Sequence, residues 1–189
     1  MLDRLLHPQV ALPSSSRGPL ELHRLFKENY DDIWRLLRGL GVPFDRLDDA
    51  TQQVFLVYAE RHADVRQGSE RSFLFGTALR VVHLVRRQAH REVLGDVDFA
   101  RSDLPGVDEL TDQKRARQLL DFMLDQMESE VRSVFVLYEL EGFTMPEIAS
   151  MAEIPLGTVA SRLRRGRERF SSLVRRYSAL EPPSIRGLR

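Results

Sequence analysis

Residues 142–170 read GFTMPEIASMAEIPLGTVASRLRRGRERF, and this stretch decides how the C-terminal part of the chain folds. Thr144 and Glu147 stand at the spacing of a capping box, which predicts the start of a helix. Residues 151–154 are too few for anything but a tight turn, and Pro155 then marks the start of a second helix. Two helices joined by so short a turn are typical of a helix-turn-helix unit, although an ordinary helical hairpin has the same pattern.

The outward face of the second helix favours nucleic acid over the ordinary hairpin. Spacing places Val159 and Leu163 on the buried face, and five arginines then fall between Arg162 and Arg169. A helix that only closed a core would not need this charge. Arginine side chains suit guanine edges and phosphates, so the charge predicts a helix that lies against DNA.

Helical periodicity continues through most of the remaining chain, and no stretch alternates as a strand would. Helices are expected over about 22–40, from Asp45 or Asp48 to about 61, over 73–91 with Ser72 as N-cap, and over 114–127 and 129–140. The predicted fold is therefore all-α, with two small helical domains joined by a flexible acidic linker and a helix-turn-helix in the second domain. The expected boundaries are a mobile tail at 1–19, the first domain at 20–93, the linker at 94–113, the second domain at 114–177 and a C-terminal tail at 178–189.

The charge is strongly segregated along the chain, although 28 basic and 28 acidic residues cancel. Residues 66–91 carry six basic groups and one acidic group, and residues 158–189 carry nine and two. Between them, residues 92–113 carry one basic and seven acidic groups. Such asymmetry indicates a charged partner, although two solvated helix faces would look the same.

Several function classes find no support in the sequence. The chain has no cysteine, so it can form neither a disulfide nor a thiolate metal site, which fits a reducing compartment. The N-terminus lacks the apolar run of a secretion signal, and no membrane span is expected. His83 and His90 are seven residues apart, too far for a zinc helix. We therefore expect no metal, no cofactor and no enzymatic activity.

Residues 124–170 resemble the fourth conserved region of bacterial sigma factors, and more narrowly that of the extracytoplasmic-function group. The motifs that carry this resemblance are Leu140-Glu-Gly142, Glu147-Ile-Ala149, Pro155-Leu-Gly-Thr-Val159, Ser161-Arg-Leu163 and Arg165-Gly-Arg167. The resemblance implies that this module reads the minus-thirty-five promoter element. It implies base-edge contacts from Ala160, Ser161, Arg164 and Arg165, and phosphate contacts from Thr158, Arg162 and Arg167. Alanine at 160 can touch only a thymine methyl group, which predicts a different preferred base there.

The first domain resembles the second conserved region of the same family. Residues 47–56 match the segment that binds the largest subunit of core RNA polymerase, which implies contacts from Asp48, Asp49 and Gln52, although acidic residues also occur at helix N-termini for electrostatic reasons. Residues 62–75 match the loop that captures the melted minus-ten element. The implied DNA contacts are Arg66, Gln67, Gly68, Ser69, Arg71 and Phe73 in this loop and helix start, followed by Arg80, Arg86, Arg87 and Arg91 on the duplex. Phe73 and Phe75 could support stacked bases, but at least one of them is expected in the core.

The sequence therefore predicts a cytoplasmic sigma factor whose partners are core RNA polymerase, promoter DNA and an anti-sigma factor. Two alternatives remain open: a helix-turn-helix regulator that acts without polymerase, and an interaction protein with no sequence preference. The sigma hypothesis also makes two structural demands. Side chains 158–167 should project toward DNA and not onto the chain's own carboxylates, and the two halves should lie apart on their tether.

Overall fold

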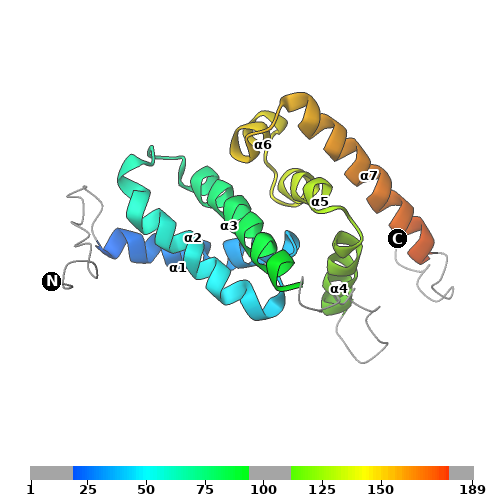
Figure 1. Cartoon of the computed structure of the whole chain (residues 1–189), viewed down its shortest axis with the longest axis horizontal. Coiled ribbons are helices and arrows are strands. Elements are labelled where there is room, and N and C mark those ends of the chain that lie inside the picture. The colour runs from blue at the N-terminus through cyan, green and yellow to red at the C-terminus, as the bar shows by residue number, and fades with distance from the viewer. Residues whose placement is uncertain (1–18, 94–111, 179–189) are drawn as a thin grey trace.

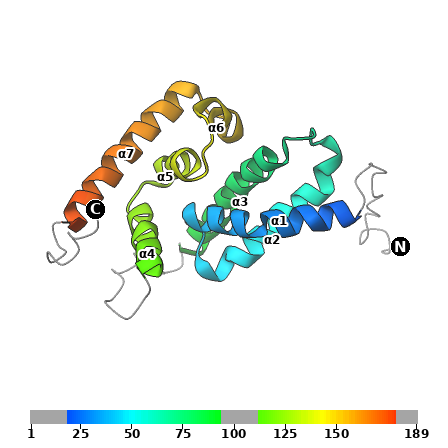
Figure 2. The ribbon, with the colours of Figure 1, turned by 180° about the vertical axis from the view of Figure 1, so that it is seen from behind.

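The computed structural model describes residues 19–93 and 112–178, and within these ranges it is all-helical (Figures 1 and 2). The helices are α1 (Pro19–Gly39), α2 (Leu47–Arg61), α3 (Glu70–Val93), α4 (Asp112–Asp125), α5 (Ser129–Phe135), α6 (Met145–Ala152) and α7 (Leu156–Ser178). The 3-10 turns η1 (Phe44–Arg46) and η2 (His62–Asp64) precede α2 and α3, and the π-helical turn η3 (Val136–Leu140) continues α5. The predicted all-α class with a C-terminal helix-turn-helix is confirmed.

The N-terminal half consists of α1, α2 and α3 around one apolar centre. Four apolar residues spaced three and four apart or adjacent at the C-terminal end of α1, Ile33, Leu36, Leu37 and Leu40, are fully buried. Gly41 ends α1 in a left-handed conformation (φ +92°), which lets Val42 donate its N–H to the Leu37 carbonyl at 3.0 Å. The turn sends α2 back along α1.

The C-terminal half consists of α4 to α7, with α7 as its longest helix (Figure 1). A side chain at Gly166 would place its Cβ 3.1 Å from Phe135, so glycine allows α7 to approach α5 this closely. Val159 and Leu163 are buried on the inner face of α7, as their spacing predicted. The close contact between Gly166 and Phe135 fixes the rotation of α7 about its axis, and so determines which of its side chains face outward.

Two predicted helix boundaries were wrong. Ser72 does not cap the third helix, because α3 already begins at Glu70 and Phe73 donates its N–H to the Ser69 carbonyl. Met151 and Ala152 were assigned to the interhelical turn but belong to the last turn of α6. The predicted linker (94–113) lies outside the described residues except for its last two, which are part of α4, and nearly all of both tails is outside them as well.

The two halves are in contact, which differs from the expectation that they lie apart. Helix α3 packs against α6 and α1 packs against α4, and buried side chains from both halves form one continuous apolar cluster. Phe75 of α3, for example, lies 5.0 Å from Phe143 of the C-terminal half, between ring centroids. The structure therefore shows a closed arrangement of two helical parts.

A buried arginine completes this contact. Arg132 on α5 is only 6% exposed. Its Nε donates to the Gly39 carbonyl at 2.6 Å, its Nη2 to the Arg38 carbonyl at 3.2 Å, and its Nη1 to the Asp125 carboxylate at 2.6 Å. A helix end leaves carbonyls free to accept further hydrogen bonds, and here a guanidinium from the other half donates to two of them, of which the Arg38 carbonyl also accepts the Gly41 N–H at 2.9 Å.

Arg86 of α3 approaches the same helix end. Its Nη2 donates to the Leu40 carbonyl at 2.6 Å. Burial, followed by the nearby charge of Arg132, lowers the pKa of the Arg86 guanidinium to about 10. Gly41 leaves room for this cluster, because a Cβ there would lie 2.9 Å from Arg132 Nη1.

Replacing Arg132 with alanine should lower the free energy of unfolding by about 3 kcal/mol, since it leaves buried carbonyls of α1 and Asp125 without their cationic partner. Urea denaturation followed by circular dichroism measures this loss. Arg24→Ala is the matched control, because its ion pair with Glu28 is exposed on α1 and should contribute little to stability. Equal losses for the two variants would contradict the structural role of Arg132.

Candidate nucleic-acid interface

The helix-turn-helix has the geometry that its sequence predicted. Thr144 and Glu147 form the capping box at the start of α6, with the Thr144 N–H donating to the Glu147 carboxylate at 2.7 Å. Glu153 then adopts a left-handed conformation (φ 54°), the only non-glycine residue of the described ranges with positive φ. The Pro155 carbonyl accepts N–H groups of the first turn of α7. The turn is thus set by one strained residue and one proline.

The outer face of α7 holds the side chains that the sequence assigned to the upstream element. Ala160, Ser161, Arg164, Arg165 and Arg167 are exposed, whereas Thr158 and Arg162 are half-buried. The Ser161 hydroxyl donates to the Thr158 carbonyl at 2.9 Å and so stays close to the helix surface. The structure therefore brings all seven residues together on one helix, with arginines extending beyond small side chains.

The arginines of α7 do not project freely, which contradicts one demand of the sequence hypothesis. Four of them form ion pairs with carboxylates of the same half: Arg162 with Glu130 (2.5 Å), Arg164 with Glu168 (3.2 Å), Arg165 with Glu128 (3.8 Å) and Arg167 with Glu139 (2.6 Å). The Arg167 guanidinium also lies 5.1 Å from the centre of the Tyr138 ring. The carboxylates come from α5, η3, α7 itself and the turn between α4 and α5.

These pairs leave most of the guanidiniums open to solvent. The side chains of Arg164, Arg165 and Arg167 are 72%, 52% and 53% exposed, and Arg162 alone is largely covered, at 19%. Exposed ion pairs contribute about 0–1 kcal/mol each, so a phosphate can displace such a carboxylate at little cost. The ion pairs therefore orient the arginines of α7 without removing them from reach of a polyanion.

The loop before α3 gathers the residues assigned to the downstream element. Arg66, Gln67 and Gly68 are exposed, and Ser69 donates its N–H to the Arg66 carbonyl to close a turn. Gly68 has φ +84° with open space around it, so backbone can be approached there. Phe73 is half-buried against Tyr58, and Phe75 is buried, which confirms that at least one of the two belongs to the core.

The arginines of α3 do not share one free face. Arg71 contacts the Glu141 carboxylate at 3.3 Å and Arg80 contacts Glu153 at 3.1 Å, both across the contact between halves. The Arg86 guanidinium turns onto the end of α1, while Arg87 is exposed. Sequence reasoning missed Arg132, Glu141 and Glu153. Only Arg132 carried a signal, since it interrupts the apolar run that begins at Val131.

The residues assigned to polymerase lie together on α2. Asp48, Asp49 and Gln52 are exposed in its first two turns. Asp48 accepts hydrogen bonds from Trp34 Nε1 at 3.0 Å and from the Tyr30 hydroxyl at 3.3 Å, which fixes its carboxylate against α1. Exposed Phe26, Phe44 and Leu56 on α1, η1 and α2 add apolar area that the sequence did not point to.

Comparison with a family model identifies the C-terminal half. Residues 117–170 match the model "Sigma-70, region 4". Over 131 residues the chain is 35% identical to the ferric citrate uptake sigma factor FecI of Escherichia coli, a match that spans 66% of this chain and 73% of that protein. It is 25% identical over 186 residues to the ECF RNA polymerase sigma-E factor of E. coli, spanning 92% and 97%.

A third relative is longer than this chain. The match to the ECF RNA polymerase sigma factor SigE of Mycolicibacterium smegmatis is 26% identical over 175 residues and spans 90% of this chain but only 65% of that protein. Among solved structures, the sigma factor RpoE of Bartonella quintana, in complex with the anti-sigma factor NepR, superposes with a TM-score of 0.69 at 19% identity. It covers 82% of this chain and 97% of that one, which shows a shared fold.

Two carboxyl groups near the helix-turn-helix should titrate on opposite sides of the ordinary glutamate pKa of 4.5. Burial raises the pKa of Glu141, so its contribution to stability is largest at low pH and is lost as the pH rises through the raised value. Hydrogen bonds from Thr144 lower the pKa of Glu147, so its contribution is present above 4.5 and is lost as the pH falls through the lowered value.

Carboxyl-detected NMR titration measures both groups in one experiment. The control is Thr144→Ala, which should move the Glu147 pKa part of the way back toward 4.5 and leave Glu141 unchanged. Titration of both groups on the same side of 4.5 would contradict the hydrogen bonding and burial described here.

Proposed function

The chain belongs to the extracytoplasmic-function sigma factors, and we propose that it binds core RNA polymerase and directs promoter-specific initiation of transcription. The observation that carries this proposal is the agreement between the region 4 match and the helix-turn-helix geometry, with exposed arginines on the outer face of α7. Sigma factors are not enzymes, so the chemistry of RNA synthesis belongs to the polymerase.

We infer that α7 reads the minus-thirty-five element in the major groove. Arg164 and Arg165 have the exposure and the chemistry for base edges or nearby phosphates, and Ser161 is short enough to allow a close approach. Ala160 would meet a thymine methyl group. Thr158, Arg162 and Arg167 would hold phosphates, with Arg162 the least available because its side chain is largely covered.

The N-terminal half would capture the minus-ten element once its bases are unpaired. The turn at residues 66–69 offers an exposed backbone with open space at Gly68 and two polar side chains for base edges. Arg71, Arg80 and Arg87 would contact phosphates, and Phe73 would support the loop. Arg86 is the member of this set that is turned away, toward the Leu40 carbonyl.

Core polymerase would bind the start of α2. Asp48, Asp49 and Gln52 provide a carboxylate and amide patch suited to a basic helix, and exposed Phe44 and Leu56 supply apolar area nearby. The acidic linker, which the structure does not describe, would pass through the basic interior of the polymerase.

Cytoplasmic localisation and an anti-sigma partner also belong to this proposal. None of the helices in residues 19–93 and 112–178 is long and apolar enough to cross a membrane. Two solved structures of the same fold are complexes: one of RpoE with the anti-sigma factor NepR, and one of CnrH with the cytosolic domain of CnrY. The latter superposes with a TM-score of 0.61 at 21% identity and covers 83% of this chain and 89% of that one. An inhibitor that binds this chain would act in the same compartment as polymerase.

Run-off transcription with purified core enzyme separates the sigma function from that of a polymerase-independent regulator. The proposed function requires a transcript that starts at a defined promoter and depends on this chain. Specific duplex binding without any promoter-specific transcript would favour the regulator instead. Binding without sequence preference and with shallow salt dependence would favour a plain interaction protein.

Replacing Arg165 with alanine should weaken recognition of the upstream element by about 1–3 kcal/mol and relax the preference at one base pair, because a base-edge contact is lost. Competition binding against a set of single-base variants measures both effects. Arg175→Ala, in the last turn of the same helix, is the control and should leave the base preference unchanged. A loss that is equal on all sequences would reassign Arg165 to a phosphate.

Replacing Asp49 with arginine should abolish binding to core polymerase and leave duplex binding intact, since a cation would face the basic partner helix. Size-exclusion chromatography with core enzyme measures the first property and gel shift the second. Glu60→Arg reverses an exposed charge at the other end of α2 and should still bind. If both variants bind core equally well, the docking site lies elsewhere.

A further inference from the structure

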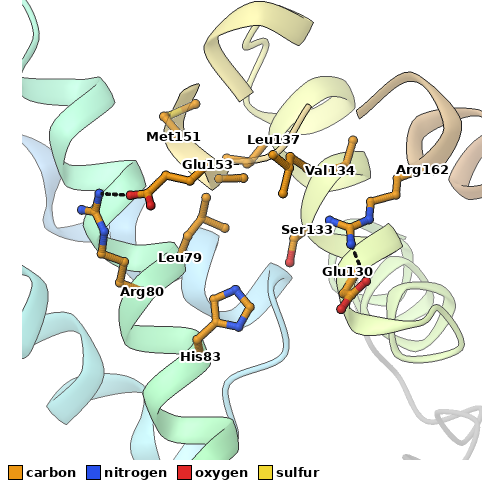
Figure 3. Close-up of a pocket in the computed structure, with 12 residues that line it drawn as sticks. Leu79, Arg80, His83, Glu130, Ser133, Val134, Leu137, Met151, Glu153 and Arg162 are labelled. Carbon is orange, nitrogen blue, oxygen red and sulfur yellow. Dashed lines mark hydrogen bonds and ion pairs between the residues drawn. The ribbon is translucent and has the colours of Figure 1, made fainter. Parts of the chain in front are cut away.

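Two neutral donors hold the Asp48 carboxylate in place. Trp34 Nε1 donates to it at 3.0 Å and the Tyr30 hydroxyl at 3.3 Å. Glu130 and Glu153 are instead paired with arginines, as Figure 3 shows, so their negative charge already has a cationic partner. Neutral donors leave the charge of a carboxylate uncompensated, and Asp48 forms no ion pair within residues 19–93 and 112–178. Asp48 is therefore an oriented anion that still lacks a cation.

Both hydrogen bonds reach the same oxygen of this carboxylate. Oδ1 of Asp48 accepts from the indole and from the phenol, and Oδ2 accepts from neither. The residue is exposed in the first turn of α2, beside Asp49. An ionised carboxylate can accept about four hydrogen bonds over its two oxygens. The acceptor sites that remain suit the charged N–H groups of an arginine or a lysine.

Aromatic packing fixes the two donors. Phe26, Tyr30 and Trp34 follow one another at steps of four residues, which places them on one face of α1. The Tyr30 ring lies 5.2 Å from that of Phe26 and stacks on Phe55 of α2 at 6.4 Å between centroids. The Trp34 ring meets Phe44 edge to face at 6.0 Å. The phenol and the indole are thus held by their rings, independently of the carboxylate that they bind.

Trp34 also supports an exposed aromatic side chain. Phe44 of η1 is 72% exposed, yet it packs against the Trp34 ring, and the Arg38 guanidinium lies 5.8 Å from its centroid. An aromatic side chain that its neighbours already hold loses little conformational freedom when a partner covers it. Phe44 and Asp48 are presented together, because both contact the same indole.

We propose that Trp34 and Tyr30 are positioning residues for polymerase binding: they hold Asp48 ready for an arginine or a lysine of core polymerase, and Trp34 supports Phe44 as an apolar contact beside it. This inference rests on the proposed function and names the chemistry of the partner at this site. A carboxylate that is oriented before binding avoids the loss of side-chain freedom that a mobile one undergoes.

A conservative double variant tests the proposal by removing the donors and keeping the rings. Tyr30→Phe/Trp34→Phe deletes the phenol hydroxyl and the indole N–H, so Asp48 loses both hydrogen bonds. Affinity for core polymerase, measured by fluorescence anisotropy of labelled protein, should fall about fivefold to twentyfold. Tyr177→Phe removes a hydroxyl from the last turn of α7 and should bind as wild type. Unchanged affinity of the double variant would overturn the proposal.

A double-mutant cycle separates positioning from a general loss of structure. Asp48→Asn keeps an acceptor but removes the charge, and it should weaken core binding about tenfold. In that background Tyr30→Phe/Trp34→Phe should cost less than about a further twofold, because the donors then have no charge to orient. Losses that multiply in full would mean that the aromatic pair acts independently of Asp48, and the positioning role would be wrong.

A spectroscopic test uses Trp34 as the one tryptophan of the chain. Its indole N–H gives a single signal in the proton–nitrogen correlation spectrum of the free protein. Asp48→Asn should shift this signal, because a neutral acceptor replaces a charged one, whereas Asp49→Asn should leave it nearly in place. A signal that does not move in Asp48→Asn would show that the hydrogen bond is absent in solution, which contradicts the proposal.

The outcomes also separate this proposal from the proposed function. Weakened binding of Asp48→Asn together with full binding of Tyr30→Phe/Trp34→Phe would remove the positioning role and leave the docking site intact. Wild-type protein that neither binds core polymerase nor gives a promoter-specific transcript would refute the proposed function, and this inference with it.

A second variant covers the case in which the double variant does not fold, which circular dichroism and duplex binding detect. Tyr30→Phe alone removes one oxygen atom and should weaken core binding about twofold to fivefold, because Asp48 keeps only the bond from Trp34. Wild-type affinity of a folded Tyr30→Phe would show that the phenol has no part in positioning the carboxylate, contrary to the proposal.

Discussion

The closed arrangement depends on a charge buried where two halves of the chain meet. Arg132 of α5 reaches the carbonyl end of α1, and Arg86 of α3 reaches the next carbonyl along. Three elements distant in sequence are thereby held at one helix end, with Asp125 balancing one of the two cations. Buried cations are costly unless they are paired, so these hydrogen bonds can form in few relative positions of the two halves. The cluster therefore fixes how the halves are placed against each other.

The sequence revealed the individual helices and the hairpin but not how the halves meet. Periodicity located α1, α2 and α7 because each buries a single stripe, and the capping box located the start of α6. The contact between α3 and α6 had no such signal: it depends on Gly76, which in sequence is only a weak helix residue, and on ion pairs between residues about seventy positions apart. Partners of an exposed arginine cannot be assigned from spacing, since three of the four paired arginines of α7 take their carboxylates from other segments of the chain.

The assumption of free guanidiniums failed for a general reason. A protein of zero net charge that gathers cations on two helices has as many anions elsewhere, and folding brings the two signs together. The result is a set of arginines whose orientations are already set by weak partners. Such ion pairs change how DNA binds. A phosphate must replace a carboxylate that already holds the arginine, whereas on a solvated face the phosphate would meet an arginine with no anionic partner.

Glu153 links two properties of the molecule that are usually considered separately. Its left-handed backbone forms the corner of the helix-turn-helix, and its carboxylate holds Arg80 on the other half. A glycine would suit the corner better but would offer no carboxylate. The helix-turn-helix is consequently not an independent module. A helix-turn-helix grafted from a homologue with glycine at this corner would read its promoter element unchanged, but it would lack the ion pair with Arg80 and would therefore weaken the contact between the two halves.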